Sequence, residues 1–411
     1  MMLKWVAMVG ALCLQAGALQ AQSTDSTAAK GEPVEILDIE FSDAGLSGAG
    51  GDRLKAELAD TQFIAVGEDH GFAGAPQLAQ ALASEARAFG PLYHAVEVGP
   101  VTMQWVRRRL AAGGVETLQK DLAGKPLAFP FLSNREDAEL ADGFDHGDRV
   151  WGIDQEFIGA PTILMDELAG LTPDAPTQAS VEAIRDADIA NLAKGDFDAL
   201  WMNRASAAEF ADLQASFVGS KRAETIIDAL AASARIYQLN QSGAYLQNNE
   251  EREALRRGYF LVLYRAAPEA APRVLFKMGA YHLGRGTTPA SIYDLGSLLP
   301  GLAAANGLTS VHIVYLPMGG MVRAIRPGKA TAVQPYEDEG VGAMLAAANI
   351  APERIGATGH VLIPLAPLRH ALAGKKMRAL PALSRFVLLG FDYLVTTRDA
   401  EAATALEAVD E

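Results

Sequence analysis

The stretch "FIAVGEDHG", residues 63 to 71, places two acids and a histidine directly after an apolar run. The first four residues predict a short buried strand that ends at Gly67. In open α/β sheets, the carboxyl ends of parallel strands point into the crevice where ligands bind. Glu68, Asp69 and His70 therefore follow the strand at the position expected for a binding or catalytic site.

Strand and helix signals alternate through the first half of the chain. The predicted strands there are 62–66, 92–99 and 149–154, and the predicted helices are 76–89, 101–112 and 161–168. Later strands are predicted at 273–279, 310–317 and 385–397, with 359–365 as an additional candidate. Alternation of this kind favours a parallel sheet with right-handed crossovers. We therefore expect an α/β fold with a central, mostly parallel sheet flanked by helices.

The middle of the chain breaks this alternation. Residues 177–267 contain long helical patterns without a strand signal, which predicts a helical insertion or subdomain over the strand ends. The expected segments are a signal peptide (1–21), a leader and flexible N-terminal segment (22–55), a first half of the core (56–176), the helical subdomain (177–267) and a second half of the core (268–411).

The N-terminus has the layout of a secretory signal peptide. One lysine precedes an apolar run from Trp5 to Leu14, and small and polar residues follow, with cleavage expected after Ala18 or Ala21. Cys13 is the only cysteine and would leave with this peptide. The mature chain would then have no disulfide and no thiolate ligand or nucleophile. We expect a periplasmic or secreted protein without an integral membrane segment.

Charge and motif content narrow the function further. A formal charge of −15 over 411 residues argues against nucleic acid as the partner. No G-x-S-x-G elbow is present, which disfavours a serine esterase of the α/β-hydrolase type. No G-x-G-x-x-G motif or P-loop follows the first strand, so nucleotide binding has no support. A small-molecule or peptide substrate is the expected partner.

Three other strands also end in residues that can carry chemistry. The second predicted strand closes with Glu97 in "HAVEVG", and the third leads to Asp154 and Glu156 in "GIDQE". The strand "RVLFKMG" is followed by His282 and Arg285. Parallel strands bring such ends to one edge of a sheet, so we expect these side chains to meet the first histidine motif.

Two of these motifs share one form. Residues 67–70 and 279–282 both read G-x-x-H after an apolar strand. Paired G-x-x-H motifs with a glutamate closing the second strand resemble the superfamily of erythromycin esterases, Tiki/TraB-type metalloproteases and ChaN-type haem-binding lipoproteins. The stretch "NNEEREALRRGYF" (248–260) is similar to the helix before the second histidine in the esterase branch, and it offers Arg252. The resemblance covers roughly 62–285 and the final strand, and it is strongest to that branch.

The resemblance implies an exported hydrolase that needs no cofactor and acts on an ester, lactone or amide. His70 would be the general base, Glu68 and Glu97 would orient it or the water, and His282 with Arg285 would stabilise the oxyanion. A neutral imidazole is a competent base near pH 7, and a nearby carboxylate fixes its tautomer. The residues expected to contact the substrate are Arg252, Arg285, Asp69 and Asp154.

Two alternatives stay open. The single residue between Glu68 and His70, and the "GAYH" form of the second motif, are closer to the metalloprotease branch. A divalent metal on His70, Glu97 and His282 would then support a metal-dependent peptidase. The ChaN-type branch instead implies haem or ligand binding without catalysis.

Overall fold

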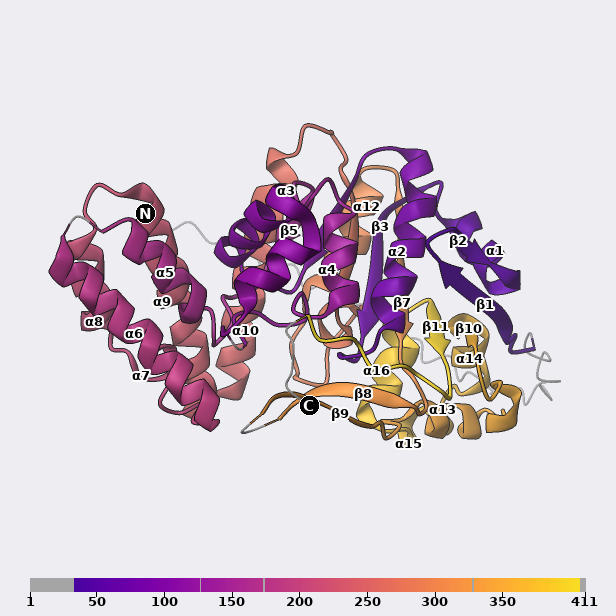
Figure 1. Cartoon of the computed structure of the whole chain (residues 1–411). Coiled ribbons are helices and arrows are strands. Elements are labelled where there is room, and N and C mark those ends of the chain that lie inside the picture. The colour runs from indigo at the N-terminus through magenta and orange to yellow at the C-terminus, as the bar shows by residue number, and fades with distance from the viewer. Residues whose placement is uncertain (1–32, 126, 173, 327–328, 407–411) are drawn as a thin grey trace, which may run out of the picture. The chain divides into compact units, whose positions relative to one another are not determined.

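The central sheet decides where the candidate residues meet (Figure 1). The computed structural model describes residues 33–406 except 126, 173 and 327–328. The strand order is β2-β1-β10-β11-β7-β3-β6-β4-β5, and the six strands from β11 to β5 run parallel to their neighbours. Strands β10, β1 and β2 pair antiparallel at one side. The predicted α/β fold with a mostly parallel sheet is therefore confirmed.

The strands of this sheet are short. Their bounds are β1 Leu37–Ser42, β2 Gly45–Ser47, β3 Thr61–Glu68, β4 Leu92–Val96, β5 Val150–Gly152, β6 Arg273–Gly279, β7 Thr309–Tyr315, β10 His360–Pro364 and β11 Tyr393–Thr396. Every residue of β3 is buried, as expected for a parallel strand covered on both faces. Strand β3 pairs with β6 from Phe63↔Val274 to Glu68↔Gly279, so the two G-x-x-H motifs leave the sheet side by side.

Helices fill the connections between the strands. Their bounds are α1 Gly48–Glu57, α2 Gly74–Ala86, α3 Pro100–Leu122, α4 Arg135–Asp142, α5 Pro161–Gly170, α6 Ala175–Lys194, α7 Trp201–Arg204, α8 Ala207–Ser216, α9 Lys221–Gln241, α10 Tyr245–Ala266, α11 Ala280–Leu283, α12 Leu299–Ala305, α13 Val341–Ala347, α14 Leu365–Ala371, α15 Lys375–Ala379 and α16 Ala382–Gly390. Helix α3 is kinked at Gly113 and Gly114. A separate hairpin pairs β8 (Met321–Arg326) with β9 (Lys329–Pro335).

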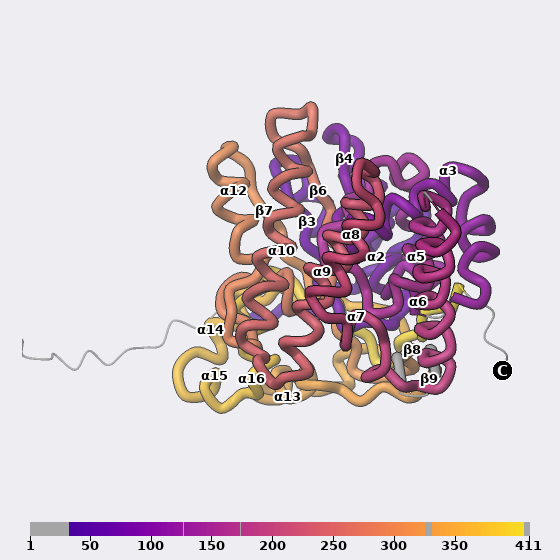
Figure 2. The backbone as a smooth tube through the Cα atoms, turned by 90° about the vertical axis from the view of Figure 1, so that its left-hand side faces the viewer, coloured from indigo at the N-terminus to yellow at the C-terminus, as the bar shows by residue number. Residues whose placement is uncertain are grey.

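The segment between β5 and β6 includes the long helix α6, and helices α7 to α10 follow it in the chain. Helix α9 contacts α3, α5, α7, α8 and α10, and α10 contacts β5. Figure 1 shows α6 to α9 together on one side of the sheet, and Figure 2, viewed from that side, shows them in front of β3, β4 and β6. Helices α9 and α10 also supply residues to the cavity described below.

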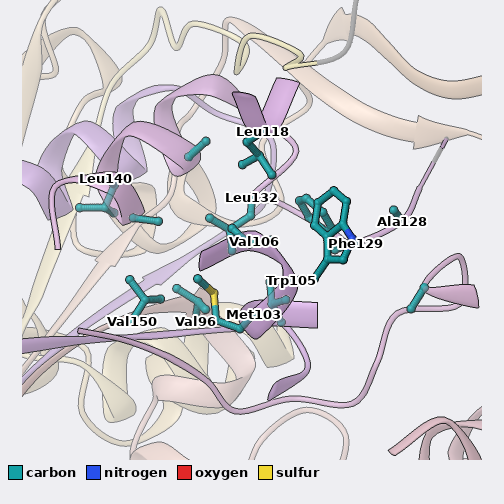
Figure 3. Close-up of a cluster of buried hydrophobic side chains, with 14 of the residues drawn as sticks. Val96, Met103, Trp105, Val106, Leu118, Ala128, Phe129, Leu132, Leu140 and Val150 are labelled. Atoms are coloured by element: carbon teal, nitrogen blue, oxygen red, sulfur yellow. The ribbon is translucent and has the colours of Figure 1, made fainter. Parts of the chain in front are cut away.

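Apolar packing fixes the helices next to β4 and β5. Val96 and Val150 of the two strands belong to one buried cluster with Met103 of α3 and Leu140 of α4 (Figure 3). Burying each such side chain contributes roughly 1.5–3 kcal/mol. The cluster therefore holds the start of α3 against the strand end that presents Glu97.

The structure corrects several sequence predictions. The run 385–397 was expected as one strand, but it forms the end of α16, and only Tyr393–Thr396 is the strand β11. An apolar run does not separate a buried strand from a buried helix face. The segment 22–55, expected as a flexible leader, contributes β1, β2 and most of α1 from Leu37 onward. Strand β3 does not end at Gly67 but continues through Glu68.

The expected signal peptide and Cys13 lie outside the described residues. Among the helices of the described residues, none combines the length and apolarity needed to cross a bilayer.

Candidate active site

A cavity of about 500 Å³ lies at the carboxyl ends of the central strands. Its floor is formed by residues that end or follow β3, β4, β5 and β6, and its walls include side chains of α9 and α10. The sequence-predicted residues that line it are Glu68, Asp69, His70, Glu97, Asp154, Arg252 and His282. The expected convergence of the strand ends on one pocket is therefore what the structure shows.

His70 is held by a carboxylate and an aromatic ring. Its Nδ1 lies 2.8 Å from Oε1 of Glu68, at hydrogen-bond distance, and its ring stacks on Phe131 with centroids 3.6 Å apart. Burial lowers the pKa of His70, but the hydrogen bond with Glu68 and the charge of Glu97 raise it more, so the net shift is upward. Phe131 has a φ of 60°, a left-handed conformation that is uncommon for a bulky residue. The sequence offered no signal for this stacking partner.

Glu97 sits between the two histidines. Its Oε2 lies 3.6 Å from Nε2 of His70, and its Oε1 lies 3.3 Å from Nε2 of His282. The amide of Gly279 donates to Oε2 at 2.9 Å, and Arg252 donates to Oε1 at 2.8 Å. Burial raises the pKa of Glu97, but the charges of His282, His70 and Arg252 hold it well below its usual range. Glu97 is therefore a carboxylate at neutral pH.

The second histidine has its own carboxylate, which the sequence analysis missed. His282 in α11 contacts Oδ2 of Asp294 through Nδ1 at 2.8 Å. Asp294 in turn accepts two hydrogen bonds of 3.0 Å from the buried Arg256. Asp294 lies 12 residues beyond the histidine in a loop, and no motif marked it.

Helix α10 delivers two arginines from adjacent turns, as residues four apart must. The Nε of Arg252 donates to Asp154 at 3.0 Å, and Arg256 donates to both oxygens of the same carboxylate at 3.1 Å. Arg252 was expected here from the sequence. Arg256 is fully buried and does not line the cavity, but it pairs with both Asp154 and Asp294 next to it.

A buried lysine completes the charge network. Lys277 in β6 lies 2.6 Å from Oε1 of Glu68 and 2.6 Å from Oδ1 of Asp137 in α4. Burial lowers the pKa of Lys277, but the charges of Asp137 and Glu68 raise it above its usual value. The only signal in the sequence was a lysine inside the apolar run "RVLFKMG", where the pattern calls for an apolar residue.

Two other acids have separate placements. Asp69 lines the cavity, and burial raises its pKa. Glu156 does not enter the site but accepts hydrogen bonds from the amides of Val101 and Thr102 at the start of α3. Burial raises the pKa of Glu156 to about 7. Glu156 is therefore the acid that accepts from the first amides of α3.

Arg285 is a correction. Its guanidinium donates to Asp392 at 2.6 and 2.7 Å and to the carbonyl of Ser310 at 3.1 Å. It does not line the cavity. Arg285 is three positions after His282, and the chain turns after α11, so the arginine is directed to the loop before β11. The expected oxyanion role of Arg285 has no geometric basis.

On the metal-dependent alternative, the ligands would be His70, Glu97 and His282. Among residues 33–406 apart from the few not described, no group of three His, Cys, Asp or Glu side chains is arranged to hold a metal ion. The oxygens of Glu97 instead face Arg252 and the amide of Gly279. The oxygens of Glu97 are thus occupied by hydrogen-bond donors and are not left open to coordinate a metal ion.

No family model matches the sequence, and no curated protein matches it. Among solved structures, the chain is similar to an erythromycin esterase mutant in its open conformation, with a TM-score of 0.56 and 14% identity over 87% of this chain and 95% of that chain. A Bacillus cereus protein gives a TM-score of 0.47 with 12% identity over 86% and 92% of the two chains. A protein described as a succinoglycan biosynthesis protein gives 0.48 with 14% identity over 86% and 91%. At this identity, the similarity to the esterase shows that this chain shares its fold.

Proposed function

We propose that the protein is an exported hydrolase of the erythromycin-esterase-like superfamily that adds water to an ester, lactone or amide. The observation that carries the proposal is the arrangement of His70. Glu68 fixes its Nδ1 at 2.8 Å, and its Nε2 is directed to the cavity beside Glu97. A carboxylate that accepts from Nδ1 leaves Nε2 as the proton acceptor. This is the geometry of a general base.

In the proposed reaction, Nε2 of His70 takes a proton from water while the water oxygen attacks the carbonyl carbon. The carbonyl oxygen becomes an oxyanion, and the tetrahedral intermediate then expels the alcohol or amine. The proton held on His70 goes to that leaving group, which restores the neutral imidazole. The products are a carboxylic acid and an alcohol or amine, and no cofactor takes part in these steps.

Arg252 is the cation that the structure offers to the oxyanion. It lines the cavity, keeps 26% of its side-chain surface exposed and is anchored by Asp154 and Glu97. A positive charge held in place before the reaction stabilises developing negative charge without reorganisation. Arg252 therefore takes the role that the sequence assigned to Arg285, with His282 beside it.

The test uses erythromycin and p-nitrophenyl acetate as probes, with hydrolysis followed by mass and by absorbance. His70→Ala is expected to lower kcat/KM on the order of 10²- to 10⁴-fold with little change in Tm. The matched control is His146→Ala, because His146 is a histidine of 68% side-chain exposure whose carboxylate partner is Asp142, outside the cavity. Equal activity of the two variants would overturn the proposal.

Two further measurements separate the alternatives. On the proposed mechanism, EDTA leaves activity unchanged, whereas a peptidase of the Tiki/TraB type would lose it. Added haem should give no Soret band, whereas a ChaN-type binding protein would produce one.

Export is a separate part of the proposal. Its support is the layout of residues 1–21, with an apolar run too short for a comfortable membrane span. N-terminal sequencing of protein recovered outside the cytoplasm should give a start after Ala18 or Ala21. A start at Met1, or a lipid on Cys13, would contradict it.

A further inference from the structure

Lys277 belongs to the buried network, and the proposed reaction gives it no task. It belongs to the strand β6, and 4% of its side-chain surface is exposed. Its ammonium group contacts Glu68 on β3 and Asp137 on α4, each at 2.6 Å. It does not line the cavity, so it cannot touch a substrate there. Its contact with the site is through Glu68, which is also the partner of His70.

Glu68 holds His70 in the tautomer that the proposed reaction needs only while its carboxyl group is ionised. Its side chain is 2% exposed, and among the described residues its Oε2 has no hydrogen-bond partner. Burial raises the pKa of Glu68, and the charge of Lys277 and the contact with His70 lower it below its usual value. Without the ammonium group, burial would favour the protonated acid.

The protonation state of the Glu68 carboxyl group selects the tautomer of His70. A carboxylate accepts from Nδ1–H, which leaves the lone pair on Nε2. A protonated Glu68 would instead donate to Nδ1, and the neutral imidazole would carry its proton on Nε2. In that state the lone pair of His70 is on Nδ1, where it accepts from Glu68, and Nε2 cannot take a proton from water.

We propose that Lys277 is a positioning residue: by keeping Glu68 a carboxylate, it makes Nε2 of His70 the proton acceptor of the site. The inference rests on the proposed function for its catalytic meaning, but the tautomer can be measured without a substrate. The charged or titratable groups that face Glu68 are His70 and Asp69 after β3, Lys277 on β6, Asp137 on α4 and Tyr315 on β7. Lys277 is the one fixed cation among them.

The test is nitrogen NMR of the full chain labelled with ¹⁵N-histidine, above the pKa of His70. The parent protein should show the Nδ1–H tautomer of His70. Lys277→Met should convert it to the Nε2–H tautomer and lower kcat on the order of 10²- to 10⁴-fold with a smaller change in KM. Lys125→Met is the matched control, because Lys125 also pairs with a carboxylate, Asp166 at 2.8 Å, away from this cavity. It should leave the tautomer and kcat as in the parent.

A second variant guards against misfolding. Lys277→Met combined with Asp137→Asn removes a buried cation together with a buried anion, so no unpaired charge from that pair is left. Glu68 still loses its ammonium partner, so the double variant should show the same Nε2–H tautomer. An Nδ1–H tautomer in either folded variant, or an Nε2–H tautomer in the parent, would overturn the inference. If the tautomer switches as expected but His70→Ala keeps full activity, the inference about Lys277 stands and the proposed function fails.

Discussion

At the scale of single residues, Gly279 shows how closely the site is packed. Its φ of −50° is open to any residue, so the backbone conformation does not require a glycine here. A Cβ at this position would lie 2.9 Å from Nε2 of His70 and 3.5 Å from Oε2 of Glu97. The glycine is therefore required by the approach of the histidine ring to the backbone.

Gly279→Ala should consequently move His70 and leave the fold intact. A displacement of about 1 Å at a reacting group lowers rates on the order of 10²-fold. The measurement is kcat/KM on p-nitrophenyl acetate together with Tm. Gly258→Ala is the matched control, because nothing lies within 4 Å of its added Cβ on α10. If Gly279→Ala is as active as Gly258→Ala, His70 does not act where the structure places it.

The raised pKa of His70 sets the pH dependence of the proposed reaction. A base works when unprotonated, so kcat/KM should fall as the pH drops through a value above 6.5, the usual pKa of histidine. The raised pKa also makes the stability depend on pH, but in the opposite direction to the rate, since protonated His70 stabilises the fold. Its contribution to folding is fully present below the unfolded pKa and is lost as pH rises through the folded pKa.

This pH prediction is checked by a rate profile and by unfolding free energies of the parent and His70→Ala between pH 5 and pH 9. The variant should lose the part of the pH dependence of stability that His70 supplies. An acid limb centred below 6.5 would contradict the assignment of His70 as the base.

The sequence predicted those site residues that belong to a motif at the end of a strand. His70, Glu68, Glu97 and His282 meet because each follows a strand end, and strand ends are visible as apolar runs. Phe131, Asp294 and Asp137 were missed, because they reach the site or its network from loops and a helix whose paths depend on tertiary packing. The role of Lys277 was hidden for a different reason, since its two acidic partners lie on other elements.

At the scale of elements, the loop before β11 shows where sequence reasoning failed. An apolar run covering α16 and β11 was predicted as one strand, and the break at Phe391 and Asp392 was not seen. Asp392 holds the loop between α16 and β11 in place. Its carboxylate binds Arg285 and accepts a hydrogen bond of 2.9 Å from the amide of His312. The arginine that was expected in the site therefore holds α11 to the start of β11.

Arg285→Ala should then affect stability and not chemistry. It removes two hydrogen bonds to a half-buried carboxylate and one to a backbone carbonyl, for an expected loss of about 1–2 kcal/mol in the free energy of unfolding. Urea unfolding measures this loss, and kcat/KM should stay within about twofold of the parent. Arg252→Ala provides the contrast, because Arg252 lines the cavity and should lose activity. A large rate loss for Arg285→Ala would return the oxyanion role to that residue.

At the scale of the whole molecule, the charge of −15 was useful only for excluding nucleic acid. Its distribution says more. The cavity is lined by Glu68, Asp69, Glu97, Asp154 and Glu339, against which Arg252 is the lining cation in the described part of the chain. Burial and the charges of Asp69 and Asp338 raise the pKa of Glu339, as a negative potential at the cavity requires. We therefore expect the cavity to disfavour anionic substrates.

Substrate charge should accordingly control the rate. We expect p-nitrophenyl butyrate to be hydrolysed with a kcat/KM on the order of tenfold above that of p-nitrophenyl hemisuccinate, which has the same leaving group and an added carboxylate. Because exposed charges are screened by salt, the difference should shrink as the ionic strength rises from 0.01 M to about 0.5 M. Glu339→Gln should also reduce the difference in kcat/KM between the two esters. Glu339 lines the cavity and has no salt-bridge partner among the described residues. Glu353→Gln is the control, since Glu353 is an exposed acid that does not line the cavity. Equal rates for the two esters at low salt would show that the acids of the cavity do not select its substrate.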